Sequence, residues 1–223
     1  MTIEQQMPGM LASLLWRQQV IQVRENEPFR LASGNCSPIY INCRPLISGQ
    51  AIRGLLLAFA HYRFHEMGLQ ADCIAGGETA GIPFGAWLAR DLDKPFIYIR
   101  KKAKSYGIDT RIEGTAAGRI LLFEDLITDG GSKLSFVEAI REARCEISDC
   151  MVIVDREAGG AESLSRLGVS LHALTTLTKC LQVGQEEGIL SAEADKQVRA
   201  YFADPKAWHE QRGLDFGATS QIL

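Results

Sequence analysis

The sequence of 223 residues lacks a long run of apolar residues. Its longest apolar stretches, such as Leu55 to Ala60, are far too short to cross a bilayer. The amino terminus, MTIEQQMPGM, carries no positive start before an apolar segment, so it does not resemble a secretory signal. We therefore expect a cytoplasmic protein.

A strong charge of one sign is also missing. With 24 Lys and Arg against 27 Asp and Glu, the net charge is -3, which gives no general attraction to nucleic acid or to an anionic membrane. A hydrophobic content of 46% is enough for one sizeable core or two small ones. We expect a single domain over residues 1–223, with a helix and cap strands over about 1–47 and a helical extension over about 185–223.

Common metal and nucleotide motifs are missing as well. The six cysteines form no C-x-x-C pair, so reduced thiols used as small apolar residues are expected. His61 and His65 lie one helical turn apart, but Tyr62 stands where the H-E-x-x-H motif needs Glu. Neither a Walker loop nor a G-x-G-x-x-G fingerprint occurs. We expect no metal site built from protein side chains.

Short apolar runs alternate with helical patterns along most of the chain. This alternation predicts an α/β fold with a central, mainly parallel sheet flanked by helices. The stretch PFRLASGNCSPIYINC predicts a hairpin-like cap with its turn at SGN. The expected helices are 10–23, 50–67, 84–91 and 132–143, and the expected strands are 72–75, 95–99, the run from 120, 151–154 and 169–174.

Three loops are expected where the strands of such a sheet end, which is where ligands bind. In ILLFEDLITDGGS, the part TDGGS opens into a helix, so its backbone N–H groups can surround a phosphate. Glu124 and Asp125 precede it, and we interpret them as acceptors for the hydroxyls of a ribose. The alternative is that they merely cap the next helix, or that they bind no ligand. The other two loops are GGETAGIP and the polar segment after Ile99.

That polar segment, RKKAKSYGIDTRIEG, is rich in positive charge. It is either a solvated charged surface or a mobile lid that closes over an anionic ligand and excludes water.

Taken together, ILLFEDLITDGGS resembles the PRPP-binding signature of type I phosphoribosyltransferases, where PRPP is 5-phosphoribosyl 1-pyrophosphate. FRLASGNCSPIYINCR, IAGGETAGIP, RKKAKSYG followed by IEG, and VDREAGG narrow the resemblance to orotate phosphoribosyltransferases, over roughly residues 27–175. The resemblance implies the type I phosphoribosyltransferase fold, with a small amino-terminal hood and a mobile basic lid loop.

The resemblance also implies a pentosyltransferase activity. Orotate displaces pyrophosphate from C1 of PRPP and yields orotidine 5'-monophosphate, in UMP biosynthesis. Mg²⁺ is implied as a cofactor held by PRPP and water, and a homodimer is implied in which each lid serves the neighbouring site. No nucleic-acid or membrane partner is expected.

The site residues that the resemblance implies fall into overlapping groups. Catalysis is assigned to Lys104, Arg100 and Asp125. PRPP binding is assigned to Arg100, Lys101, Lys104, Glu124, Asp125, Thr128, Asp129, Gly130, Gly131 and Ser132. Orotate binding is assigned to Thr128, Arg156, Tyr40 and Ile41.

The sequence departs from the pattern of many family members at three positions. Ala32, Ala80 and Tyr106 replace Lys, Lys and His. Positive charge that could compensate is carried by Lys102, Arg111 or Arg44. The alternatives that stay open are another type I phosphoribosyltransferase and a PRPP-binding regulator without catalysis.

Overall fold

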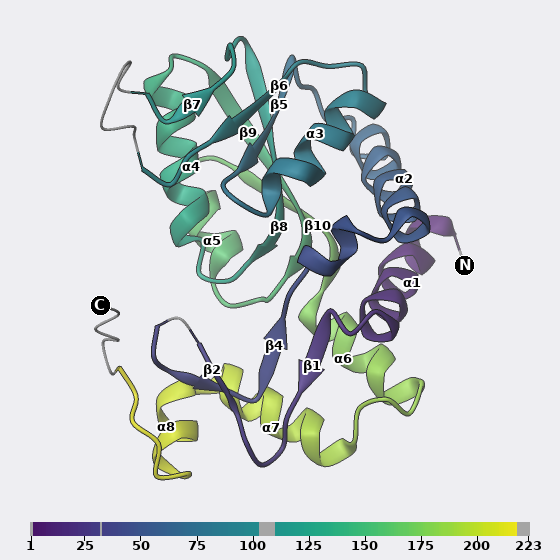
Figure 1. Ribbon diagram of the computed structural model, residues 1–223, viewed down its shortest axis with the longest axis vertical. Coiled ribbons are helices and arrows are strands. Elements are labelled where there is room, and N and C mark those ends of the chain that lie inside the picture. The colour runs from purple at the N-terminus through teal and green to yellow at the C-terminus, as the bar shows by residue number, and fades with distance from the viewer. Residues whose placement is uncertain (1, 32, 103–109, 218–223) are drawn as a thin grey trace. The chain divides into compact units, whose positions relative to one another are not determined.

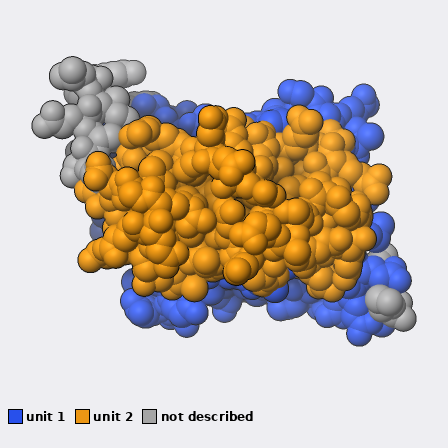
Figure 2. Space-filling model, turned by 90° about the horizontal axis from the view of Figure 1, so that it is seen from below, with its two compact units in different colours: residues 1–11, 43–178 blue, residues 12–42, 179–223 orange. Residues whose placement is uncertain are grey.

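The computed structural model describes residues 2–31, 33–102 and 110–217. The chain forms two compact units (Figure 2): residues 1–11 with 43–178, and residues 12–42 with 179–223. The second unit joins the segments expected as cap and as carboxy-terminal extension. The single-domain expectation stays a prediction, because compactness alone does not define a domain. Across the described ranges, no helix has both the length and the apolar character needed to span a bilayer.

The first unit contains a six-stranded sheet (Figure 1). All strand pairs are parallel except the last, β6 with β7, which is antiparallel. In spatial order the strands are β10 (Ser170–Thr176), β9 (Glu146–Asp155), β8 (Arg119–Ile127), β5 (Cys73–Gly77), β6 (Phe96–Ile99) and β7 (Ile112–Glu113). The predicted mainly parallel sheet is confirmed, and β7 is a strand that the polar sequence around it did not predict.

Helices cover both faces of this sheet (Figure 1). The chain moves from β5 to β6 in one direction and from β8 through β9 to β10 in the other, so right-handed crossovers place the connecting helices on opposite faces. One face carries α3 (Gly81–Asp91), and the other carries α4 (Gly131–Glu142) and α5 (Gly160–Ser165). The remaining helix, α2 (Gln50–Glu66), packs on α3 and follows the short 3-10 helix η1 (Arg44–Ile47).

The second unit contains two short antiparallel strand pairs and the last helices. β1 (Ile21–Val23) pairs with β4 (Ile39–Ile41), and β2 (Phe29–Arg30) pairs with β3 (Cys36–Ser37). The latter pair is the predicted hairpin. The helices here are α7 (Ala192–Ala203) and α8 (Pro205–Glu210), while α1 (Ile3–Arg17) and α6 (Leu177–Glu186) each continue from one unit into the other.

One expected helix is wrong in its bounds. We expected a helix over 10–23, but α1 ends at Arg17 and the chain then enters β1. Gln19 has a positive φ of 54°, which breaks the helix. Val20 and Ile21 are buried, and Ile21 is in register with Ile41 of β4. Tertiary pairing therefore overrides the apolar pattern that continued the helix.

Candidate active site

Two of the three predicted loops follow adjacent strands of the sheet. β5 and β8 lie side by side, and the chain leaves them in opposite directions. In a sheet of this kind, the crevice at such a switch point is where ligands bind. The loops after Gly77 and after Ile127 therefore lie at the edge of the sheet where we expect a ligand to bind.

The acids Glu124 and Asp125 lie inside β8 and not after its end. We expected the strand to stop before them, but β8 continues to Ile127 in parallel register with β9. Because successive side chains of a strand point to opposite faces, the two neighbouring carboxylates occupy different environments. Glu124 is 3% exposed, whereas Asp125 is half-buried.

The carboxylate of Glu124 is held on both oxygens. Its Oε1 accepts a hydrogen bond of 2.6 Å from the backbone N–H of Gly77, and its Oε2 lies 3.0 Å from Nζ of Lys133 on α4. A Cβ at Gly81 would clash with Oε1, so glycine is needed for the close approach of α3. This carboxylate therefore links the end of β5 to the helix after β8.

Burial raises the pKa of Glu124, and the Lys133 ammonium opposes that rise. For Lys133, burial would lower the pKa, but the carboxylates of Glu124 and Asp125 outweigh it and the pKa is raised. We describe the pair as ionic, because a protonated Glu124 would leave a buried ammonium without its nearest anion. Sequence reasoning missed Lys133, although it lies on the apolar face of α4 with Phe136, Val137 and Ile140.

Asp125 has a different environment. Within the described residues, its carboxylate takes part in no hydrogen bond or ion pair, so its oxygens can accept hydrogen bonds from a ligand. The alternative that Glu124 and Asp125 cap the next helix is wrong. The N-cap of α4 is Gly130, and the carboxylate that bonds to the first turn is Asp129, whose Oδ1 accepts from the N–H of Gly131 at 3.0 Å.

The segment from Thr128 to Ser132 forms the turn into α4. Gly130 has a φ of 93°, a left-handed conformation that favours glycine, and it lies close to Ser163 of α5. Asp129, Gly131 and Ser132 are exposed. The positive end of a helix of 12 residues thus opens onto solvent at the predicted phosphate cup.

Two of the predicted orotate residues lie together in this unit. Nη1 of Arg156 is 3.5 Å from Oγ1 of Thr128, and the backbone N–H of Arg156 donates to the carbonyl of Ile127 at 3.0 Å. This follows from the parallel pairing of Ile127 with Asp155. The other two, Tyr40 and Ile41, lie on β4 of the second unit. There Tyr40 is 38% exposed, and Ile41 is buried in register with Ile21.

The basic segment is only partly described. Arg100 lies 3.7 Å from Glu113, and the backbone N–H of Lys101 donates to Glu78 in the loop after β5 at 2.9 Å. Lys104 and Tyr106 lie outside the described residues, as does Ala32. A lid role for the segment therefore stays a prediction.

The structure describes two positions that bear on the sequence departures. Ala80 is buried where α3 begins. Arg111 donates hydrogen bonds to the backbone carbonyls of Arg100 at 3.1 Å and Ser135 at 3.0 Å, so this guanidinium fixes β7 and α4 in place. Lys102 and Arg44 are exposed. Of the residues we considered for compensation, Arg111 already has a structural role.

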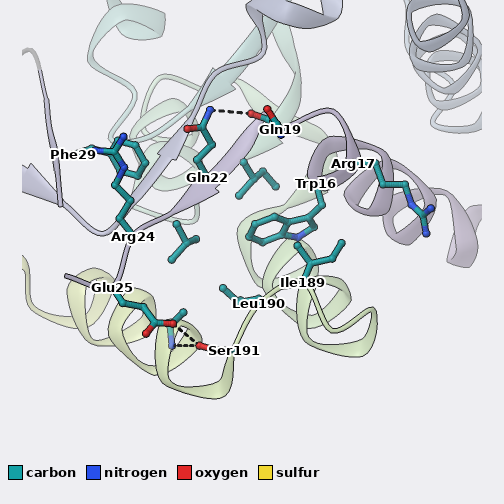
Figure 3. Close-up of a pocket in the computed structure, with 13 residues that line it drawn as sticks. Trp16, Arg17, Gln19, Gln22, Arg24, Glu25, Phe29, Ile189, Leu190 and Ser191 are labelled. Atoms are coloured by element: carbon teal, nitrogen blue, oxygen red, sulfur yellow. Dashed lines mark hydrogen bonds between the residues drawn. The ribbon is translucent and has the colours of Figure 1, made fainter. Parts of the chain in front are cut away.

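A separate pocket of about 680 Å³ lies wholly within the second unit (Figure 3). Trp16, Arg24, Phe29 and Leu190 are among the residues that line it, and none of the predicted site residues does. Over the part of the chain that the structure describes, no group of three or more His, Cys, Asp or Glu side chains could hold a metal ion.

Comparisons with known proteins identify the class. No protein-family model matches the chain. The crystal structure of orotate phosphoribosyltransferase from Aeropyrum pernix superimposes with a TM-score of 0.70 and 28% identity, and covers 80% of this chain and 98% of that chain. The fold is that of the type I phosphoribosyltransferases.

Curated relatives narrow the class to one family. Orotate phosphoribosyltransferase of Cereibacter sphaeroides is 44% identical over 208 residues, 90% of this chain and 89% of the relative. The protein of that name from Dinoroseobacter shibae is 43% identical over 216 residues, 94% of this chain and 96% of the relative. This chain belongs to the orotate phosphoribosyltransferase family.

Proposed function

We propose that this chain transfers the 5-phosphoribosyl group from PRPP to orotate, which yields orotidine 5'-monophosphate and pyrophosphate in UMP biosynthesis. The observation that carries the proposal is the identity of 44% over 90% of the chain with an orotate phosphoribosyltransferase. In the transfer, the bond from C1 to pyrophosphate breaks with its electron pair on the leaving oxygen. N1 of orotate forms the new bond to C1 and releases its proton.

The ribose is assigned to Asp125 and Glu124. The hydroxyls of a ribose donate to carboxylates, and charged acceptors form stronger hydrogen bonds than neutral ones. Asp125 is half-buried without a partner among the described residues, so it supports this role directly. Glu124 is already bonded to Gly77 and Lys133, but each carboxylate oxygen has two lone pairs and can accept again. The negative charge of the two carboxylates would also stabilise the positive charge that develops at C1 of the ribose.

The 5-phosphate is assigned to the turn into α4. Exposed backbone N–H groups at the start of a helix bind anions because the helix dipole and the unpaired donors both favour negative charge. Thr128 and Ser132 add hydroxyl donors on either side of the glycines. Asp129 is assigned to this group as well, and its bond to Gly131 holds the turn.

The pyrophosphate is assigned to Arg100, Lys101 and Lys104. Their positive charges would stabilise the negative charge that develops on the leaving group, most strongly once a closed lid excludes water. Loss of one such charge is expected to lower the rate on the order of a hundredfold. Mg²⁺, which prefers oxygen ligands and keeps several waters, would neutralise pyrophosphate charge when bound. The residues fit an ion held mainly by the substrate, because Asp125 has carboxylate oxygens free within the described structure.

Orotate is assigned to Arg156 and Thr128, with Tyr40 and Ile41. A planar guanidinium suits the carboxylate and imide edges of orotate. The contact of 3.5 Å between Arg156 and Thr128 supports a shared role at one end of the base. We also propose a cytoplasmic homodimer in which each basic lid serves the neighbouring site, without nucleic acid or membrane as partner.

The test is the change in orotate absorbance when the protein is mixed with PRPP and Mg²⁺. Parallel reactions contain uracil, adenine or hypoxanthine, and Lys104→Ala serves as the variant. We expect turnover of orotate alone and a sharp loss of rate in Lys104→Ala. Turnover of another base would favour a different type I phosphoribosyltransferase. PRPP binding without turnover of any base would favour a regulator, and Ala32, Ala80 and Tyr106 would then mark a lost activity.

A further inference from the structure

The carboxy-terminal extension is bonded repeatedly to the amino-terminal part of the second unit. Just before the extension, the carbonyl of Cys180 in α6 accepts a hydrogen bond of 2.7 Å from Nε1 of Trp16. Near α7, the hydroxyl of Ser191 donates to Glu25 at 2.6 Å (Figure 3). Beyond α8, the N–H of Gly217 donates to the side-chain oxygen of Asn35 at 2.9 Å. These bonds join segments more than a hundred residues apart, so the extension is part of the structure that supports the cap.

His209 of α8 makes the most constrained of these contacts. Its side chain is buried, and its Nδ1 lies 2.6 Å from the carbonyl of Pro205. Because a carbonyl can only accept, Nδ1 must carry the proton. Nε2 is then an acceptor, and the backbone N–H of Cys36 donates to it at 3.0 Å. The two partners therefore fix one neutral tautomer of the ring.

The accepted N–H belongs to the hairpin that carries the motif LASGNCSP. Cys36 begins β3 opposite Arg30 of β2, and it is buried in an apolar cluster with Tyr201 and Trp208. A buried backbone N–H without an acceptor is costly, so the bond to His209 stabilises the hairpin in this position. Asn35, the preceding residue, is held by the extension as well.

We propose that His209 is a positioning residue for orotate, which acts through the N–H of Cys36 to fix the hairpin. The inference rests on the proposed function, which assigns Tyr40 and Ile41 just beyond the hairpin to the base. The carboxy-terminal extension then has a specific task, to hold the base-binding motif in shape. The groups assigned to PRPP follow β6, lie on β8 or form the turn into α4, all in the first unit, so PRPP binding does not depend on this contact.

Two substitutions of His209 distinguish the contact made by Nε2 from the contact made by Nδ1. The side-chain amide of His209→Gln places an oxygen near the position of Nε2 and can still accept from Cys36. The shorter side chain of His209→Asn places its amide near the position of Nδ1, so this variant keeps the contact with Pro205 and loses the acceptor for Cys36. We expect the KM for orotate to rise about tenfold in His209→Asn and to stay within about twofold of the wild type in His209→Gln. The KM for PRPP should be unchanged in both variants.

Hydrogen exchange gives a second readout that does not need activity. The amide of Cys36 should exchange faster in His209→Asn than in His209→Gln. Ser191→Ala is the matched control, because it removes another bond between the extension and the cap but leaves the hairpin contact. It should lower the melting temperature without changing the KM for orotate.

The outcomes are distinct. An unchanged KM for orotate in His209→Asn, or an equal rise in both KM values in both variants, would overturn the positioning role. If the wild type turns over no orotate, the proposed function fails instead. The exchange rate of the Cys36 amide would then still decide whether His209 fixes the hairpin.

Discussion

Replacement of Lys133 by Met tests the buried ion pair that joins β8 to α4. Met has a similar length and no charge, so the variant removes the ammonium that lies 3.0 Å from Glu124 with little change in volume. Glu124 is 3% exposed and Lys133 is 9% exposed, so water cannot replace the lost partner without a change in structure. The carboxylate is left with the N–H of Gly77 as its described donor.

The size of the effect follows from the geometry. Two unit charges about 3 Å apart attract by about 5 kcal/mol at an effective dielectric constant of about 20. Removal of one partner of a buried pair costs about 3–5 kcal/mol, because the other charge stays buried without compensation. For a chain of this length, we expect a fall in melting temperature of about 10 °C. Lys206→Met is the matched control, since its exposed pair with Glu210 contributes about 0–1 kcal/mol.

The loss of stability in Lys133→Met should depend on pH. In Lys133→Met, burial without the ammonium raises the pKa of Glu124 further above its value in the unfolded chain. A group with a raised pKa binds protons more tightly in the folded state, so it lowers stability as pH rises from the unfolded toward the folded pKa. The difference in stability between wild type and variant should therefore be larger at about pH 8 than at about pH 5.5.

The assay is urea unfolding of the wild type, Lys133→Met, Glu124→Gln and the double variant at both pH values. In the double variant a neutral amide replaces the stranded carboxylate, so the double loss should be smaller than the sum of the single losses. A loss below about 1 kcal/mol in Lys133→Met, or a loss that is equal at the two pH values, would refute the ionic pair.

Three further predictions concern close packing, thiol reactivity and base recognition. Gly81→Ala should destabilise the protein by about 2 kcal/mol in thermal unfolding, because the added Cβ meets Glu124. Gly54→Ala should stabilise it by about 0.5–1 kcal/mol, because there is open space around this position of α2. A loss of stability in both variants would contradict this account. All six cysteines are buried and burial raises the pKa of Cys73 to about 11, so Ellman's reagent at about pH 8 should react slowly with the folded chain and with all thiols after unfolding. Fast reaction of several thiols in the folded protein would show that the packing is wrong. Arg156→Lys should raise the KM for orotate about tenfold or more and leave that for PRPP unchanged, because lysine lacks the planar fork; an equal change for both substrates in steady-state kinetics would remove Arg156 from the base site.

The sequence predicts five of the six strands of the sheet because they are short apolar runs with helical patterns between most of them, whereas β7 lies in a polar segment. The hairpin was equally visible, since SGN separates two extended runs and Gly34 has a φ of 86° there. The helix over 10–23 failed because apolar residues continue from α1 into β1, and periodicity cannot tell the two apart over three residues. The expected end of β8 was too early, because adjacent acids in a sequence are typical of a loop. In the structure the strand continues through Glu124 and Asp125 in register with β9.

The sequence does carry a signal for the partner of Glu124. Lys133 precedes Phe136, Val137 and Ile140 by three, four and seven residues, which is the spacing of the buried face of a helix. A lysine in such a position needs an anion, and adjacent acids occur in the preceding strand. By contrast, the bond between His209 and Cys36 joins residues separated by 173 positions, and no local pattern could predict it.

The Glu124–Lys133 pair and the His209–Cys36 bond lie in different units and can be perturbed separately. Glu124 binds the end of β5 through Gly77 and α4 through Lys133, so it holds β8 and α4 together, and PRPP is assigned to residues of both elements. His209 binds the hairpin to which the base motif belongs, within the second unit. Lys133→Met should therefore raise the KM for PRPP, and His209→Asn the KM for orotate. If each variant instead raised both KM values, the two ligands would depend on one shared structure. The separate assignment of PRPP to β8 and of the base to the cap would then be wrong.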